Sequence, residues 1–124
     1  MLYSFDSGRY VEKLPHKAQF KAWRKKLSDS AFEAVRNELM THFNENEVNT
    51  AGWIPGHDWT GTVYDPLYRA CGNNEEAAGL FFGLIVFKLL MDDPDKVWGF
   101  GRYEINNIPV KSLTYFLVQN PPSR

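Results

Sequence analysis

The pattern of apolar positions singles out one long stretch in the second half of the chain. From 77 to 91 every residue except Lys88 is apolar or glycine, so no polar stripe runs along it. A helix that is apolar on all sides must be covered on all sides. Asn73 is placed to cap its start, and Pro94 ends it because proline cannot continue the hydrogen-bond ladder. The pattern therefore predicts a buried hydrophobic helix at about 74–91.

Two glycines, Gly79 and Gly83, lie one turn apart on one side of this predicted helix. In a membrane such a pair marks a helix-dimer seam. Here the apolar run is shorter than the ~20 residues needed to cross a bilayer, and Lys88 interrupts it. The glycines therefore predict that a strand or another helix closely approaches the backbone at this point.

The N-terminal third predicts two amphipathic helices, at about 16–27 and 31–44. Pro15 lies in the first turn of the first helix, a position that proline favours. Ser30 and Glu33 have the spacing of a capping box at the start of the second. The apolar stripes that predict the buried sides are Phe20, Trp23 and Leu27 in the first helix, and Phe32, Val35, Leu39 and Phe43 in the second.

Shorter segments complete the expected fold. The strongest predicted strands, 97–105 and 110–118, form a hairpin across residues 106–109. Other segments are predicted strands at 2–5, 50–54 and 59–64, a turn at 6–8, a single helical turn at 66–71 and a flexible tail at 120–124. We therefore predict one α+β domain spanning 1–124, with a mainly antiparallel sheet on which the hydrophobic helix packs.

Composition limits the class of protein. The chain has 124 residues, enough for one domain with its own core, and it contains four Trp, six Tyr and nine Phe. Its single cysteine permits no internal disulfide, and the sequence shows no signal peptide or sorting motif. A cytoplasmic location without membrane attachment is therefore expected.

Charge is distributed unevenly although the net charge is only −1. Residues 1–26 contain seven basic and two acidic residues, a net charge of +5, whereas the remainder carries −6. Such asymmetry indicates binding partners more than it indicates a fold. The cations of the first helix are candidate partner-binding residues, and the helical segment 13–26 could lie along nucleic-acid phosphates. An ordinary solvated face is the alternative. The candidate residues are Lys17, Lys21, Arg24 and Lys25.

The loop from 53 to 65 is the most unusual local composition, with glycine, proline, two tryptophans and several polar groups. Binding pockets combine apolar walls with a few placed polar groups. His57 and Asp58 are candidates for a general base or a metal ligand. The candidate ligand-binding residues are Trp53, Trp59, Thr60, Thr62, Tyr64 and Asp65. The alternative is a well-packed connector in which the tryptophans cover the edge of the core.

Cys71 precedes the predicted hydrophobic helix, where a thiolate would be stabilised. A Cys71–His57 nucleophile pair is therefore one hypothesis. The other is that Cys71 is a small buried residue. The sequence contains no H-x-x-x-H, H-E-x-x-H or cysteine pair, so neither a metal nor another cofactor is expected.

Trp98, Phe100 and Arg102 share one face of a predicted strand. Exposed aromatic residues beside an arginine are typical of protein interfaces. The alternative is that this face packs on the hydrophobic helix.

No nucleotide-binding or hydrolase motif appears, so whether the protein is an enzyme stays open. The first hypothesis is a small protein that binds a macromolecular partner, as an accessory subunit or an immunity- or antitoxin-like inhibitor, with a homodimer as one form of it. The second is an enzyme or small-ligand protein that uses the 53–65 loop with His57 as base. The third is nucleic-acid binding through the basic helix.

Overall fold

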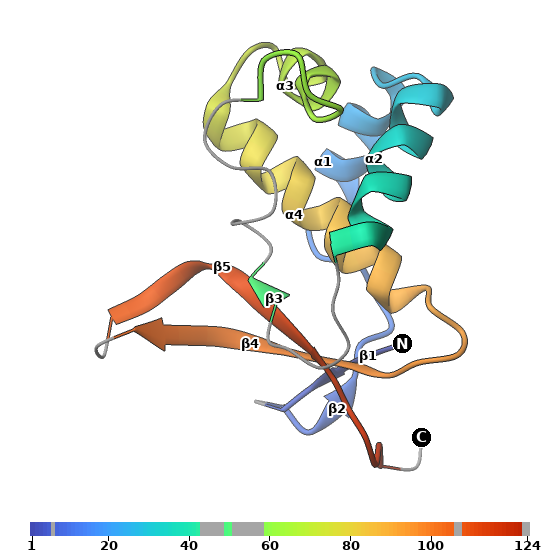
Figure 1. Ribbon diagram of the computed structural model, residues 1–124, viewed down its shortest axis with the longest axis vertical. Coiled ribbons are helices and arrows are strands. Elements are labelled where there is room, and N and C mark those ends of the chain that lie inside the picture. The colour runs from blue at the N-terminus through green and yellow to red at the C-terminus, as the bar shows by residue number, and fades with distance from the viewer. Residues whose placement is uncertain (6, 43–48, 51–58, 106–107, 123–124) are drawn as a thin grey trace.

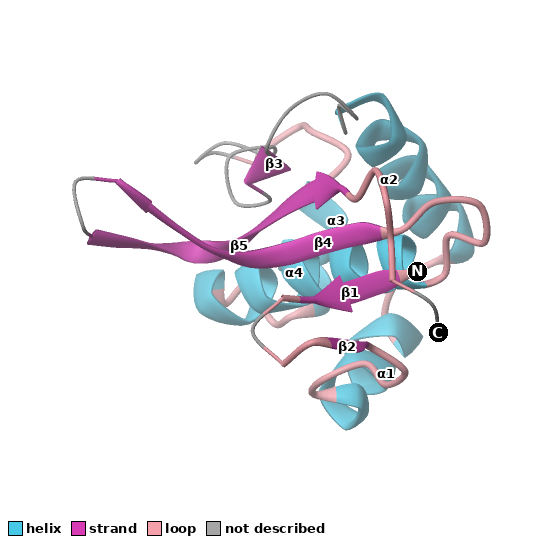
Figure 2. Ribbon diagram, turned by 90° about the horizontal axis from the view of Figure 1, so that it is seen from below, coloured by secondary structure: helices cyan, strands magenta, loops and turns pink. Residues whose placement is uncertain are grey.

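The computed structural model describes residues 1–5, 7–42, 49–50, 59–105 and 108–122. Four helices lie on one side of a five-stranded mixed sheet, which gives one small α+β domain as predicted (Figure 1). The hydrophobic helix, α4 (Glu75–Met91), lies against the sheet, with α1 on one side of it and α2 on the other (Figure 2).

The buried character of α4 follows from its sequence. Eight of its seventeen residues are buried, and its last charged residue, Lys88, forms a salt bridge to Asp92 at the C-terminal end. The N-cap is Asn74, whose side chain accepts a hydrogen bond of 3.0 Å from the N–H of Ala77. The predicted cap, Asn73, is wrong by one residue because Asn73 adopts a left-handed conformation with φ 59° in the preceding turn.

Within the described residues, the two glycines of α4 do not have the predicted role. A Cβ atom built on Gly79 or Gly83 meets no atom within 4 Å outside the helix, so no described strand or helix approaches there. Gly79 is exposed, and Leu80 beside it is 37% exposed. The expectation of close packing is wrong because the first turns of α4 leave one side uncovered in the described part of the structure.

The remaining helices are α1 (Lys17–Lys25), α2 (Asp29–His42) and α3 (Asp65–Ala70). They confirm the predicted segments with slightly different ends, and residues 43 and 44 lie outside the described residues. Ser28, rather than Ser30, caps α2, since its hydroxyl accepts a bond of 3.1 Å from the N–H of Ala31. Glu33 pairs with Arg36 instead of completing a capping box.

The sheet has the order β2-β1-β4-β5-β3. Its strands are β1 (Leu2–Ser4), β2 (Arg9–Tyr10), β3 (Asn49–Thr50), β4 (Trp98–Ile105) and β5 (Ile108–Leu117). Among the described strands only β1 and β4 pair in parallel, so the sheet is mainly antiparallel, as expected.

The strand predictions are confirmed only in part. The β4–β5 hairpin is confirmed, but Ile108 and Pro109 are paired strand residues rather than part of the turn. The predicted strand at 59–64 is wrong, because this segment is a series of turns leading into α3. Most of the predicted strand at 50–54 lies outside the described residues.

Candidate binding surfaces

The described part of the predicted loop is a connector held by its own backbone. Thr62 organises it: its hydroxyl donates to the carbonyl of Trp59 at 2.7 Å and accepts from the N–H of Tyr64 at 3.2 Å. Trp59 packs against Tyr64 and Phe82, with ring centroids 6.0 and 5.9 Å away. These contacts match the well-packed alternative. Thr60 is exposed, and Asp65 forms a salt bridge with Arg69. Trp53, His57 and Asp58 lie outside the described residues.

Tyr64 is the most unusual polar group in this segment. It is only 5% exposed, and its hydroxyl has no hydrogen-bond partner in the described structure. Burial, with a smaller contribution from the negative charge of Glu38, raises the pKa of Tyr64 to about 12. The phenol therefore stays protonated at neutral pH, and its buried donor is unsatisfied.

Cys71 is buried at the end of α3, where its N–H donates to the carbonyl of Leu67 at 3.2 Å. Burial raises the pKa of the thiol, and the nearby charge of Lys26 only partly opposes this effect. A raised pKa disfavours the thiolate that a nucleophile needs. The geometry places Cys71 in the core, beside residues of α3 and α4.

The strand face of Trp98 and Phe100 is turned toward the helices. Trp98 is 4% exposed, and its indole N–H donates to the Asp93 carboxylate at 3.1 Å. Phe100 packs edge-on against Phe87 of α4, with centroids 5.3 Å apart. These two rings pack as the alternative for this face describes. The side chain of Arg102 lies outside the described part of the structure.

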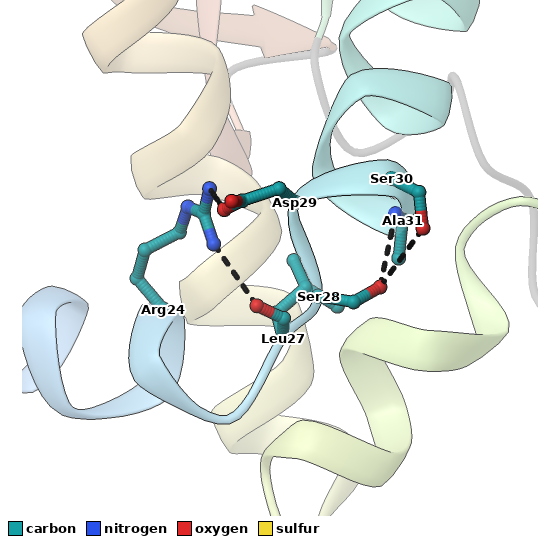
Figure 3. A network of polar contacts seen from close by, with 6 residues as sticks. All are labelled: Arg24, Leu27, Ser28, Asp29, Ser30 and Ala31. Carbon is teal, nitrogen blue, oxygen red and sulfur yellow. Dashed lines mark hydrogen bonds and ion pairs between the residues drawn. The ribbon is translucent and has the colours of Figure 1, made fainter.

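The side chain of Arg24 is hydrogen-bonded at the turn between α1 and α2 (Figure 3). Its guanidinium donates to Asp29 at 2.8 Å and to the carbonyl of Leu27 at 3.0 Å. It also lies over the ring of Phe32, 4.3 Å from the centroid. Arg24 therefore fixes the turn between the two helices.

The lysines of α1 differ from the cations of every other helix. Lys17, Lys21 and Lys25 are exposed, and none of them forms a salt bridge within the described residues. In α2, α3 and α4 the arginines and the lysine each pair with a carboxylate three or four residues away. Those pairs are Arg36–Glu33, Arg69–Asp65 and Lys88–Asp92. The segment from 17 to 25 contains no acidic residue with which such a pair could form.

The face of the sheet opposite the helices carries a group of aromatic rings that we call the aromatic cluster: Tyr3, Phe5, Tyr10 and Phe116. Tyr3 contacts Phe5 and Tyr10 edge-on at 5.1 and 5.2 Å, and Phe5 stacks on Phe116 at 5.5 Å. The rings gather around Gly99, which pairs with Tyr3 on one side and Phe116 on the other. Figure 2, seen from below, shows no helix over this face.

Sequence reasoning missed the aromatic cluster. The alternation of Tyr3 and Phe5 along a short strand was the one local signal for it. Phe116 joins them only because β1 pairs in parallel with β4, which the sequence pattern does not reveal.

A pocket of about 620 Å³ lies between α2 and the C-terminal end of α4. Its lining combines apolar side chains such as Phe32 and Met40 with charged residues of both signs. Four of these charges are paired within the chain, since Lys88 pairs with Asp92 and Arg36 pairs with Glu33.

Among the described residues no group of three or more histidine, cysteine, aspartate or glutamate side chains could hold a metal ion. In the same part of the chain, no helix combines the length and the apolar character needed to cross a membrane. No family model, curated protein or solved structure matches this chain.

Proposed function

We propose that the protein acts by binding a partner protein through the aromatic cluster. The observation that carries this proposal is a sheet face over which no described helix lies, where Phe5 is 54% exposed although the β1 residues before it are largely covered. Tyrosine and phenylalanine are enriched in protein interfaces, where a few large rings supply most of the binding energy.

The chemistry of the cluster favours a protein over a nucleic acid. A nucleic-acid platform needs cations beside its rings to track the phosphates. Strands β1 and β2 contribute a single basic residue, Arg9. The rings also contact one another, which leaves a continuous apolar surface rather than separate stacking positions. An apolar patch on a partner protein fits such a surface.

This role suits an accessory subunit or an immunity- or antitoxin-like inhibitor, because both act by occupying a surface of another protein. The alternative of an enzyme that uses His57 has no support from the described residues. Cys71, the other candidate nucleophile, is buried with a raised thiol pKa.

Site-specific photo-crosslinking tests the proposal. A photoreactive phenylalanine analogue replaces Phe5 in one sample and Leu80 in a control, since Leu80 is also an exposed hydrophobic residue but lies on α4. We expect position 5, and not position 80, to form an adduct with one protein in extracts of the source cells. The captured protein, once purified, should bind Phe5→Ala about tenfold or more weakly, as for an interface anchor. Leu80→Ala should bind it normally.

Three results would contradict the proposal. Equal adducts from both positions would show that capture is unspecific. Unchanged affinity of Phe5→Ala for the purified partner would exclude the cluster as the anchor. An adduct of twice the chain mass, with a dimer in sedimentation, would show that a second copy occupies the face instead of a different protein.

A further inference from the structure

We infer that the exposed face of α1 is a second binding surface, which takes the phosphate backbone of a nucleic acid. This inference goes beyond the protein-binding function proposed above. The surface lies on another side of the domain from the aromatic cluster, since α1 belongs to the helix layer (Figure 1). The surface consists of Lys17, Lys21 and Lys25, which we call the lysine row.

The lysine row carries an unbalanced positive charge. Its members are four residues apart, so their backbones follow one another at steps of about 6 Å along the helix. Like charges at this spacing destabilise a helix. The arginines of α2 and α3 and the lysine of α4 instead form salt bridges within the helix or at its end. The lysine row has no such bridge among the described residues, so an external anion would relieve its repulsion.

Two further lysines flank α1 in the sequence. Lys13 and Lys26 are exposed and have no salt bridge within the described structure. Arg24 does not belong to this surface, because Asp29 neutralises it. The buried side of α1 is occupied by Phe20 and Trp23, which contact Phe81 of α4 and hold the lysines outward.

The composition of this face favours phosphate over an acidic protein surface. Besides the lysines, α1 exposes only alanine and glutamine. Protein interfaces are depleted in lysine and enriched in aromatic residues, and the aromatic residues of α1 are turned inward. Lysine binds phosphate as a point charge without a fixed geometry. The expected binding is therefore independent of nucleotide sequence.

Fluorescence anisotropy with labelled oligonucleotides tests this inference. Three phosphate contacts predict a slope of log affinity against log salt of about −3 for a duplex and about −2 for a single strand. Affinity for the duplex should therefore fall about 40-fold between about 50 and 200 mM salt. The combined variant Lys17→Gln, Lys21→Gln, Lys25→Gln should lose this binding.

A matched control removes the same number of charges from cations that are paired within the chain: Arg36→Gln, Arg69→Gln, Lys88→Gln. It should keep oligonucleotide binding. Urea unfolding separates the two variants further. Loss of the lysine row should leave the midpoint unchanged or raise it, because repulsion is relieved, whereas the control should lower it.

The inference would be overturned if the unmodified protein bound neither oligonucleotide at the lowest salt concentration. It would also fail if both variants lost binding equally, since net charge alone would then explain it. Tighter binding to a polyglutamate peptide than to either oligonucleotide would assign the surface to an acidic protein instead.

Discussion

The carboxylate of Asp93 holds together the connection between α4 and β4, and its removal is the sharpest test of how this end of the fold is stabilised. One oxygen accepts hydrogen bonds from the backbone N–H groups of Asp95 and Lys96, at 2.9 and 3.2 Å. The other accepts from the indole N–H of Trp98 at 3.1 Å. Asp93→Asn keeps the shape of the side chain but replaces one acceptor with a donor. We expect this variant to fold with reduced stability.

The size of the loss in stability depends on which N–H donors water can bind when the carboxylate of Asp93 is gone. The two backbone bonds are exposed, so water can replace much of their contribution. The Trp98 ring is buried, and in either orientation of the new amide its NH2 group would face the indole N–H or the two backbone N–H groups instead of accepting from them. An unsatisfied buried donor costs about 1–3 kcal/mol, so we expect a total loss of about 2–3 kcal/mol. That is a large share of the about 5–15 kcal/mol that stabilises a typical domain.

The loss of stability in Asp93→Asn, compared with the original protein, should depend on pH. Burial alone would raise the pKa of Asp93. The hydrogen bonds from Asp95, Trp98 and Lys96, together with the positive charge of the amino terminus, outweigh burial and lower the pKa. A carboxylate with a lowered folded-state pKa contributes stability that is complete above its unfolded pKa of about 4. That contribution disappears as pH falls through the folded-state value. The original protein should therefore lose stability in acid more steeply than Asp93→Asn.

Urea unfolding followed by tryptophan fluorescence at neutral and acidic pH measures both effects, with circular dichroism as a second probe. The control is Asp95→Asn, two residues away, because that carboxylate is exposed and its side chain makes no hydrogen bond or salt bridge in the described structure. An equal loss in both variants would refute the reasoning, since it would show a general effect of charge. A pH dependence in Asp93→Asn parallel to that of the original protein would refute it as well.

Three further predictions concern single positions. Gly99→Ala should lower the free energy of unfolding by about 1–3 kcal/mol in thermal unfolding, because the new Cβ would lie 2.6 Å from the ring of Phe116 and 2.7 Å from that of Phe5. Adding Phe5→Ala should recover part of this loss, and no recovery would contradict this account. Acetylating the amino group of Met1 in this chain should lower the urea midpoint by the equivalent of about 1–3 kcal/mol. The reason is that the ammonium of Met1 donates to three carbonyls at the end of α4 and beyond it. An unchanged midpoint would argue against those hydrogen bonds. Tyr64→Phe should be neutral or stabilising by up to about 1 kcal/mol in the same assay, since it removes an unsatisfied hydroxyl, and a clear destabilisation would reveal a missed partner.

The long helix was predictable because its signal lies in one continuous stretch. Fifteen residues with one charge allow few arrangements other than a covered helix, and α4 follows that pattern. Its cap was predicted one residue early because Asn73 and Asn74 are equally good caps by residue type. The choice depends on which of them enters the left-handed turn, and the local pattern does not determine that.

The same difference explains why one of the two proposed surfaces was predicted from the sequence and the other was not. The lysine row was predicted, in a set that also included Arg24, because its members follow one another on a single helix, so helical spacing alone places them together. The aromatic cluster was not predicted, since Phe5 and Phe116 are far apart in sequence and meet only through the pairing of β1 with β4 and of β4 with β5. Strand pairing at such separations depends on the whole fold rather than on the pattern of one segment.

The two proposed surfaces are also the places where the chain departs from the rules that stabilise the rest of the molecule. In α2, α3 and α4 the arginines and the lysine are paired, and the large rings of the core are covered, so local choices agree with the fold. The lysine row keeps like charges together, and the aromatic cluster leaves Phe5 in contact with water. Violations of this kind are expected at functional sites, where stability is lower than the sequence could reach. It follows that variants that pair or remove the lysines should gain or keep stability while losing binding. Such a divergence separates a binding surface from a feature that only supports the fold.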